Sequence, residues 1–290
     1  MKILLTGATG FLGSRVLPLL VEHEVLCLVR NAGRLAKVSN ARALPGDLTR
    51  MGAWTTEIER FAPQWCIHLA WEGLPDYSLS RCRANLDAGI GLFELLARSG
   101  IERIVVAGSC WEYGGATGAV REDQPPIECG LFASTKQALR VMLESISRAA
   151  GIESRWARIF FAYGPGQRSN SLIPHCYAAY AAGRNPEIRN PELAQDFVFV
   201  EDVATGIMAV AQCDAGSGIF NIGSGRPTTV AHVVNRVARH FDRTPPFPSA
   251  QSTSGFWADT ARTAAATGWQ VRTSVDEGIA RTLSALGRRQ

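Results

Sequence analysis

The sequence predicts an α/β protein: a Rossmann-like, doubly wound parallel sheet with a smaller mixed lobe toward the C-terminus. Two observations indicate this fold. Short aliphatic runs alternate with longer helical patterns, which is typical of buried parallel strands joined by helical crossovers. A glycine-rich turn at residues 7–13 also follows the first aliphatic run directly and opens the first helical segment.

The expected elements follow this alternation along the N-terminal half of the chain. Short aliphatic or β-branched runs predict strands at 3–5, 24–29, 43–44, 65–69, 103–107 and 153–160. Apolar residues at helical spacing predict helices at 11–22, 85–99 and 132–150. This order predicts a parallel sheet with helices on both faces.

The pattern changes after Pro165, where short helical, loop and strand segments follow one another. Strands are expected at 195–200 and 219–222, a loop at 244–248 and a last helix at 275–286. We therefore expect a main domain over 1–164 and a smaller lobe over 165–290. The segment 197–211 is expected to return to the main domain.

Composition places the chain among globular proteins. Hydrophobic residues make up 46% and charged residues 19% of the 290 residues, which excludes a disordered chain. The net charge of +4 comes without long runs of like charge, so we expect no nucleic-acid partner. No apolar stretch reaches membrane-spanning length and the first strand leaves no room for a signal peptide. We therefore expect a cytoplasmic protein with no membrane partner.

The seven cysteines indicate neither a metal centre nor a disulfide framework. Their number is odd and no two of them have C-x-x-C spacing. Cys27 and Cys66 lie in apolar runs, where a thiol behaves as a small buried hydrophobe. We expect no bound metal.

The turn after the first strand has the spacing of a dinucleotide-binding loop. Gly7 permits a tight turn, Gly10 permits close approach of a pyrophosphate, and Gly13 lets the helix pack against the strand. The phosphates are expected at the positive end of that helix. The main domain is therefore expected to bind a dinucleotide and the lobe its substrate. The expected cofactor-binding residues of this loop are Gly7, Thr9, Gly10, Phe11, Leu12 and Gly13.

The end of the second strand predicts which dinucleotide binds. A carboxylate there accepts hydrogen bonds from the ribose of NAD, whereas an arginine pairs with the 2′-phosphate of NADP. This sequence has Arg30 and Asn31 at that point, so NADP is the expected cofactor and NAD the alternative. Asp47 and Leu48 end the third strand, where the adenine is expected.

By its motifs the chain resembles the extended short-chain dehydrogenase/reductase family, in particular its nucleotide-sugar epimerases, dehydratases and ketoreductases. The resemblance extends over essentially the whole chain. It implies that Leu69 and Ala70 contact the cofactor. The residues that carry it are the Gly7, Gly10 and Gly13 loop, Gly46-Asp47-Leu48, His68-Leu69-Ala70, Asn85, Gly108-Ser109, Glu112-Tyr113-Gly114, Lys136, Arg158, Tyr163-Gly164-Pro165, Phe197 to Val203 and Asn221 to Gly225.

The resemblance also implies a catalytic group formed by Ser or Thr and Tyr-x-x-x-Lys. The hydroxyl residue orients the substrate oxygen, the tyrosine exchanges a proton with it, and the lysine holds the nicotinamide ribose and lowers the pKa of the phenol. Ser109 and Lys136 fit two of these roles. Phe132 stands one helical turn before Lys136, where the family has tyrosine.

Phe132 keeps the ring but lacks the oxygen that transfers the proton, and three explanations are open. The residue is a replacement introduced into a tyrosine enzyme, or the natural enzyme moves the proton through Ser109, Cys110 or water, or the protein binds the cofactor without catalysis. Retention of Ser109 and Lys136 favours the first two. Tyr113 is not an obvious substitute, because the family carries a structural tyrosine there.

Other departures bear on the reaction and the substrate. Family dehydratases have an Asp-Glu pair where this chain has Cys110 and Trp111, so a dehydratase is not expected. An Asn that commonly contacts the substrate diphosphate is replaced by Phe161. Trp71 and Trp111 are expected in the sugar or base pocket. Cationic candidates for the diphosphate are Arg168, Arg184 and Arg189, and the expected substrate-binding residues are Trp71, Cys110, Trp111, Phe161, Arg168 and Arg184.

Together these features predict an NADP-dependent oxidoreductase that acts on a nucleotide-linked sugar as a 4-ketoreductase. The first alternative is a nucleotide-sugar 4-epimerase that keeps NAD bound. The second is a dinucleotide-sensing protein without catalytic activity. We also expect a homodimer.

Overall fold

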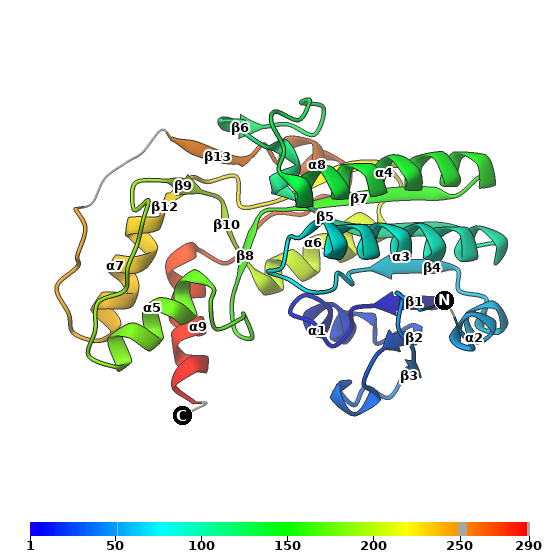
Figure 1. The fold of residues 1–290 in the computed structure, drawn as a ribbon, viewed down its shortest axis with the longest axis horizontal. Helices are drawn as coiled ribbons and strands as arrows, with labels where there is room; N and C mark the ends of the chain where they lie inside the picture. Colours follow the sequence, from blue (N-terminus) through cyan, green and yellow to red (C-terminus); the bar gives the residue numbers. More distant parts are fainter. Residues whose placement is uncertain (51, 249–253, 289–290) are drawn as a thin grey trace.

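The computed structural model describes residues 1–50, 52–248 and 254–288. Within these residues, seven strands form a parallel main sheet in the order β11-β7-β5-β4-β1-β2-β3 (Figure 1). The strand order reverses beside β1, which has β2 on one side and β4 on the other. Ligands of such sheets bind outside the carboxyl ends of the strands at this reversal. The strands are β1 (Lys2–Thr6), β2 (Glu24–Val29), β3 (Ala41–Pro45), β4 (Trp65–His68), β5 (Arg103–Ser109), β7 (Glu153–Ile159) and β11 (Gly218–Ile222).

Helices cover both faces of the main sheet, as the alternation of elements predicts. Buried side chains of β1 alternate between the faces, because successive residues of a strand point in opposite directions. Ile3 and Leu5 pack with the helices of one face and Leu4 with those of the other. The first face carries α1 (Gly13–Val16), η1 (Leu17–Leu20) and α6 (Val200–Gln212), and the second carries α2 (Trp54–Phe61), α3 (Leu79–Arg98) and α4 (Leu131–Ala150).

The first helix is shorter than the sequence predicts. An α-helix ends at Val16 and a 3-10 turn continues to Leu20. Pro18 explains the change, because its ring nitrogen has no proton to donate to the preceding turn. In contrast, α3 begins six residues before the expected 85, since the Ser78 side chain accepts a hydrogen bond from Arg81 N and caps the helix.

The lobe has its own apolar core between α5 (Leu172–Ala181), α7 (Val230–His240) and α9 (Val275–Gly287). In the described part of the lobe and its border, β8 (Phe161–Tyr163) pairs with β10 (Phe197–Phe199), and a second small sheet has the order β12-β9-β13-β6. Its strands are β6 (Gly118–Val120), β9 (Ala194–Gln195), β12 (Thr228–Thr229) and β13 (Gly255–Ala258); α8 (Ala261–Thr267), η2 (Ala32–Arg34) and η3 (Cys110–Tyr113) complete the elements.

Two strand predictions for the C-terminal part need correction. The expected strand 195–200 is divided, because buried Asp196 separates β9 from β10 and α6 already begins at Val200. Asp196 accepts hydrogen bonds from the backbone of Ser224, Gly225 and Ala258, which fixes this break. The expected strand 219–222 belongs to the main sheet as β11 and not to the lobe, since it pairs with β7. The domain boundary at 164/165 stays a prediction.

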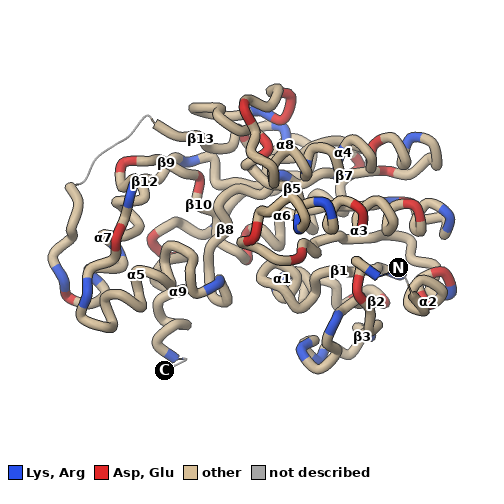
Figure 2. The backbone as a smooth tube through the Cα atoms, viewed as in Figure 1, with Lys and Arg blue, Asp and Glu red and all other residues tan. Residues whose placement is uncertain are grey.

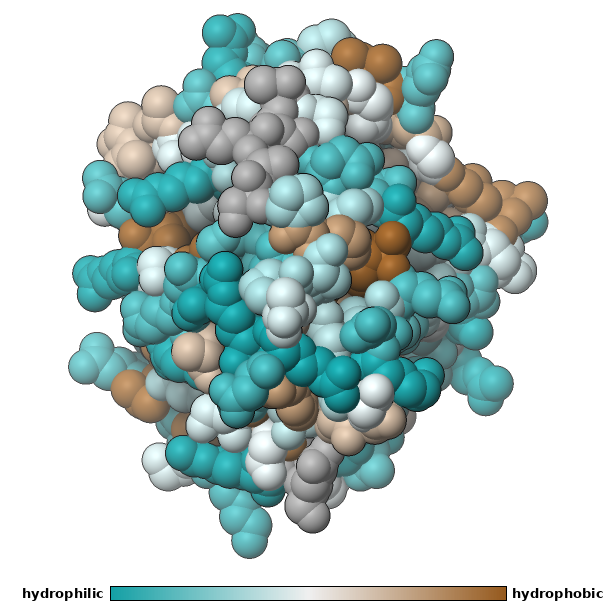
Figure 3. All heavy atoms as spheres, turned by 90° about the vertical axis from the view of Figure 1, so that its left-hand side faces the viewer, coloured by the Kyte–Doolittle hydropathy of each residue, from teal (hydrophilic) through white to brown (hydrophobic). Residues whose placement is uncertain are grey.

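The outer surface is of mixed polarity. Figure 2 shows Lys and Arg interspersed with Asp and Glu along both parts of the chain. Hydrophilic side chains cover most of the lobe-side face in Figure 3, with hydrophobic residues in small separate groups. None of the helices in the described ranges is long and apolar enough to cross a membrane.

Candidate functional site

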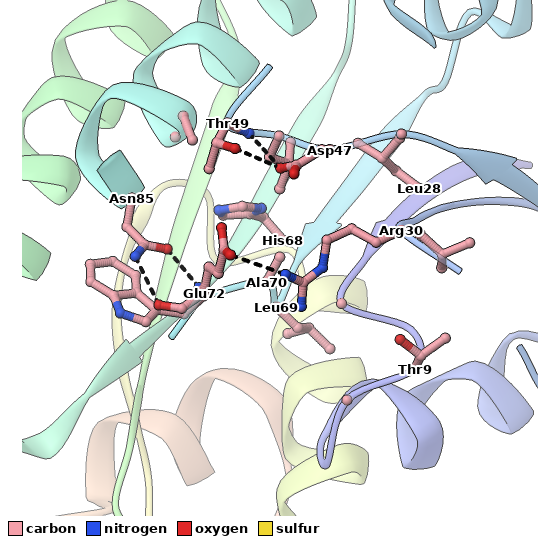
Figure 4. Close-up of a pocket in the computed structure, with 18 residues that line it drawn as sticks. Thr9, Leu28, Arg30, Asp47, Thr49, His68, Leu69, Ala70, Glu72 and Asn85 are labelled. Carbon is pink, nitrogen blue, oxygen red and sulfur yellow. Dashed lines mark hydrogen bonds and ion pairs between the residues drawn. The ribbon is translucent and has the colours of Figure 1, made fainter. Parts of the chain in front are cut away.

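A first cavity of about 190 Å³ opens at the carboxyl edge of the main sheet, where the strand order reverses (Figure 4). Its walls come from the turns that follow β1, β2, β3 and β4, and from α3. Many of the predicted cofactor residues meet here although they are far apart in sequence. The lining residues are Gly7, Thr9, Gly10, Leu28, Val29, Arg30, Gly46, Asp47, Leu48, Thr49, His68, Leu69, Ala70, Trp71, Glu72, Asn85, Ala88 and Gly89.

The glycines of the first turn make a cradle that larger residues would fill. Gly7 has φ +75°, and a Cβ there would stand 2.8 Å from the backbone nitrogen of Ala70. A Cβ on Gly13 would stand 2.0 Å from the carbonyl oxygen of Gly7, well inside the contact limit. The residues therefore fit the backbone approach that a dinucleotide pyrophosphate requires.

The other predicted cofactor residues of the glycine loop and of the turn after β2 do not line the cavity and make other contacts. Gly13 packs against Gly7, and Leu12 is partly buried against the core on the face of the sheet that carries α1 and α6. Phe11 is half-buried, and its carbonyl accepts a hydrogen bond from the Ser14 hydroxyl. Asn31 caps the turn after β2 by accepting a hydrogen bond from Gly33 N.

Arg30 does line the cavity, but its guanidinium already has a carboxylate partner. Arg30 Nη1 lies 3.1 Å from Oε1 of Glu72 (Figure 4). Arg81 Nη1 lies 3.3 Å from the same oxygen. Glu72 comes from the loop after β4, and the Asn85 amide holds its backbone through hydrogen bonds of 2.7 and 3.0 Å. Sequence reasoning missed Glu72, because the pair forms between residues 42 positions apart.

Asp47 and His68 are also fixed by hydrogen bonds in the wall of the cavity. Asp47 accepts from the backbone and hydroxyl of Thr49, and the backbone hydrogen bond is the largest cause that lowers the pKa of its carboxyl group. The His68 ring nitrogen Nδ1 lies 2.7 Å from the hydroxyl of Thr6. Burial, with the nearby Lys136 charge, lowers the pKa of His68 to about 3, so the ring is neutral at pH 7.

Lys136 is buried on α4 and points toward the wall of this cavity. Its Nζ donates a 2.8 Å hydrogen bond to the carbonyl of Ala107 and lies 4.1 Å from the centre of the Trp71 ring. Burial lowers its pKa to about 8, while Glu112 opposes that shift. Both protonation states are therefore within reach near neutral pH.

Trp71 connects the first cavity to a second one. The indole lines the first cavity, and among the described residues its buried Nε1 has no hydrogen-bond partner. Its ring also meets Phe132 edge-on, with the centroids 5.2 Å apart. An orphaned donor in the cavity wall is a second feature that fits a polar ligand.

The second cavity, of about 490 Å³, lies beside Phe132. It is bounded by the first residues of α4 and by the strands β8, β9 and β13. It is mainly aromatic and apolar. Predicted Trp111 and Phe161 line it, whereas Tyr77, Gln195 and Phe256 were not predicted there. Its described lining residues are Tyr77, Trp111, Gly114, Glu128, Gly130, Leu131, Phe132, Ala133, Phe161, Gln195 and Phe256, and these include no Lys or Arg.

Phe132 is the centre of an aromatic cluster in this wall. Its ring centroid lies 5.2 Å from those of Trp71 and Tyr77 and 6.0 Å from that of Trp111. The ring thus lines the second cavity and contacts Trp71 of the first. Its edge has no oxygen, so the position itself cannot exchange a proton.

Ser109 and Cys110, the residues before Trp111, differ in what they can do. The Ser109 hydroxyl accepts a hydrogen bond from Trp111 N and caps the short helix η3. Cys110 is 2% exposed and packs in the core of the main domain; burial raises the pKa of its thiol well above the usual value. Neither Ser109 nor Cys110 is among the residues that line the two cavities, and the burial of Cys110 argues against its expected contact with substrate.

A buried ion pair between Glu112 and Arg158 lies next to Ser109. Glu112 Oε2 accepts from Arg158 Nε at 3.1 Å, and Glu112 also accepts from Trp156 Nε1 and Ser109 N. Both partners are almost fully buried. Next to them, Tyr113 is buried and donates to Asn221 at 2.6 Å, in agreement with a structural role for this tyrosine.

The predicted arginines lie apart from both cavities. Arg168 and Arg184 are exposed, and neither is among the lining residues of either cavity. Tyr77 and Glu72, by contrast, belong to the loop after β4, the same loop as Trp71. The rule that ligands bind at the carboxyl ends of the strands was the available signal for both.

In sequence and in fold, the chain is similar to proteins of a known family. A model of the NAD dependent epimerase/dehydratase family matches residues 3–223. The chain is 24% identical to UDP-glucuronate 4-epimerase of Thermodesulfobacterium geofontis, over 97% of this chain and 94% of the relative. It is 25% identical to dTDP-6-deoxy-L-talose 4-dehydrogenase (NAD(+)) of Aggregatibacter actinomycetemcomitans, over 83% and 91%. Among solved structures, MoeE5 in complex with UDP-glucuronic acid and NAD is 28% identical, with a TM-score of 0.88 and 100% coverage of both chains.

Proposed function

Since the chain belongs to the NAD dependent epimerase/dehydratase family, we propose that it is a nucleotide-sugar 4-epimerase that keeps NAD bound. The observation that supports this most is the contact between Trp71 of the first cavity and Phe132 of the second. It joins the first cavity, with its glycine turn, to an aromatic cavity that suits the apolar face of a sugar ring. The curated relatives named as 4-epimerases favour this reaction over net reduction.

The residues of the chain have separate tasks in this proposal. NAD, when bound, would supply the hydride acceptor. Gly7, Gly10 and Asp47 would hold its phosphate and adenosine parts, and Lys136 would hold the nicotinamide ribose. Ser109 would orient the reacting sugar hydroxyl, and the aromatic cluster would exclude water from it.

The sequence favoured NADP because of Arg30, whereas the contacts of Arg30 support NAD. A 2′-phosphate would have to displace Glu72 from the guanidinium and would then lie near that carboxylate. NAD brings no such charge. We therefore propose that Glu72 supplies, from the β4 loop, the carboxylate that NAD-binding relatives have at the end of the second strand.

Equilibrium titration of NAD and NADP into apo-protein tests this cofactor preference. Wild type should bind NAD at least as tightly as NADP. Glu72→Gln should improve NADP binding by about tenfold or more by removing a like charge, and Arg30→Ala should abolish that gain. Tighter binding of NADP to wild type, lost in Arg30→Ala, would restore the original cofactor prediction.

The second candidate is a 4-ketoreductase, which the exposed position of Arg30 at the cavity mouth and the 4-dehydrogenase relative favour.

The substrates to test first are UDP-glucuronate and UDP-glucose, which the named relatives and MoeE5 suggest. Product analysis by NMR should show the C4 epimer without net change in cofactor. Stoichiometric NADPH consumption on a 4-keto sugar would support the reductase, and binding without turnover the sensor.

A further inference from the structure

We propose that Tyr77 supplies the phenol that position 132 lacks and exchanges the proton of the sugar hydroxyl. This rests on the proposed function, because it requires oxidation and reduction at C4. It concerns a residue of the loop after β4, outside the Tyr-x-x-x-Lys segment. The chain keeps the lysine and the hydroxyl residue of the family's catalytic group, as Lys136 and Ser109, but Phe132 has no acidic hydrogen.

The position of Tyr77 carries the proposal. Its ring centroid lies 5.2 Å from that of Phe132, with the rings tilted by 56°, and 5.5 Å from that of Trp111. All three rings line the second cavity. Among the described lining residues, Tyr77 is the one phenol, and it reaches the cavity beside the ring where the usual hydroxyl is missing.

The other groups near Phe132 are poorer proton carriers. The thiol of Cys110 is buried away from both cavities, and the hydroxyl of Tyr113 is buried and bonded to Asn221. Ser109 is a poorer proton carrier than Tyr77, because an aliphatic alcohol is a much weaker acid than a phenol. Glu128 is the other titratable side chain among the described lining residues, but its side chain is exposed on a loop.

The loop that carries Tyr77 is braced, so the ring has a defined place. Asn85 bonds the backbone of Glu72 on one side of the loop, and Ser78 caps α3 directly after Tyr77. Arg81, on α3, also forms ion pairs with Glu72 and Asp76 of this loop. A reacting group held on a fixed segment needs little reordering when substrate binds.

The proposed step balances as follows. With Tyr77 ionised, the O–H and C–H bonds at C4 of the sugar break. The proton goes to the Tyr77 oxygen, the hydride with its electron pair goes to the nicotinamide of NAD, and the C4 ketone forms. In the reverse half-reaction the hydride returns to C4 from the opposite face and Tyr77 gives the proton back to the oxygen.

Tyr77→Phe tests the step with minimal change of shape, because the ring and its aromatic contacts remain. With UDP-glucuronate or UDP-glucose, kcat should fall by about 10²- to 10⁴-fold while KM changes little. Introducing Phe132→Tyr into Tyr77→Phe should restore at least about tenfold of the lost rate. The matched control is Tyr180→Phe, since in the described structure the Tyr180 hydroxyl has no hydrogen-bond partner and lines neither cavity.

Two further readouts separate proton exchange from a structural role. The pH profile of kcat should lose one limb in Tyr77→Phe but not in Tyr180→Phe. Calorimetric titration of UDP should give the same affinity in both variants.

Each outcome has a distinct meaning. Turnover by wild type that survives in Tyr77→Phe overturns the proposal and leaves the proposed function intact, and loss in Glu128→Gln instead would assign the proton to that carboxylate. If wild type is inactive and Phe132→Tyr alone is active, Tyr77 does not supply the phenol. If neither protein turns over any 4-hydroxy or 4-keto nucleotide sugar, the proposed function fails and this inference with it.

Discussion

At the residue scale, burial beside the site shifts the pKa of ionisable groups toward their neutral forms. Lys136 and His68 are both buried, and the Lys136 charge further lowers the pKa of His68. Neutral His68 can share a hydrogen bond with the hydroxyl of Thr6 at the end of β1. The same burial makes the protein sensitive to acid.

We expect His68 to destabilise the fold as the pH falls below about 6.5. Its pKa is about 3 in the folded protein, below the ordinary histidine value of 6.5, so the unfolded chain binds the proton first. Stability is complete above the unfolded pKa and is lost as the pH falls toward the folded one, by about 2 kcal/mol between pH 7 and pH 5.

Urea denaturation of wild type and His68→Gln at pH 7 and pH 5 measures this contribution. The variant should lose less stability between the two pH values than wild type does. His175→Gln, at an exposed histidine, is the control and should behave as wild type. Equal losses in wild type and His68→Gln would contradict the assignment.

At the scale of elements, the turns that follow the strands place the site, and the glycine turn after β1 is the most constrained. It is closed by a hydrogen bond from Gly10 N to Gly7 O. Its outer face contacts the backbone after β4, so two loops 62 residues apart in the chain, at Gly7 and Leu69, share one wall. The turn therefore contributes to stability as well as to binding.

Gly13→Ala should damage both properties. The new Cβ would lie 2.0 Å from Gly7 O, so the turn must open, at a cost of about 1–3 kcal/mol by analogy with overpacked cores. NAD affinity should fall at least about tenfold, measured by calorimetric titration beside thermal denaturation. Gly52→Ala is the matched control, because its nearest contacts would be at 3.9 Å. Unchanged NAD binding in Gly13→Ala would show that the turn does not hold the dinucleotide.

At the scale of the whole molecule, the second cavity exists because the lobe returns to the main domain. β11 forms one edge of the main sheet, while β13 pairs with β6 from the main part of the chain. Phe256 and Gln195 thereby face Phe132 across the cavity. On the outer side, α3 and α4 lie side by side (Figure 1) and expose Leu79, Val141 and Met142.

These exposed side chains make the predicted homodimer testable. Exposed apolar residues on the outer side of paired helices are typical of an interface. Light scattering should give the mass of two chains, and Val141→Glu with Met142→Glu should shift it to one without loss of helical signal in circular dichroism. The control pair, Ala280→Glu with Ser284→Glu, lies at exposed positions of α9 in the lobe, away from α3 and α4, and should leave the mass unchanged. A single-chain mass for wild type would remove the dimer prediction.

The sequence by itself determined the fold class, the dinucleotide turn, the family and the missing tyrosine. These depend on local patterns: strand and helix periodicity, glycine spacing, and the one-turn separation of Phe132 from Lys136. It was less accurate where a single residue interrupts a pattern, as at Pro18 in the first helix and Asp196 in the expected strand.

Only the tertiary structure decided which side chains meet. The Arg30–Glu72 pair and the Tyr77–Phe132 contact each join residues from different loops, and no local pattern specifies such pairs. Their physical cause is the parallel sheet, which brings the carboxyl ends of β2, β4 and β5 to one edge. Burial, which sets the pKa values of Lys136 and His68, likewise depends on everything packed around them and appears only once the chain has folded.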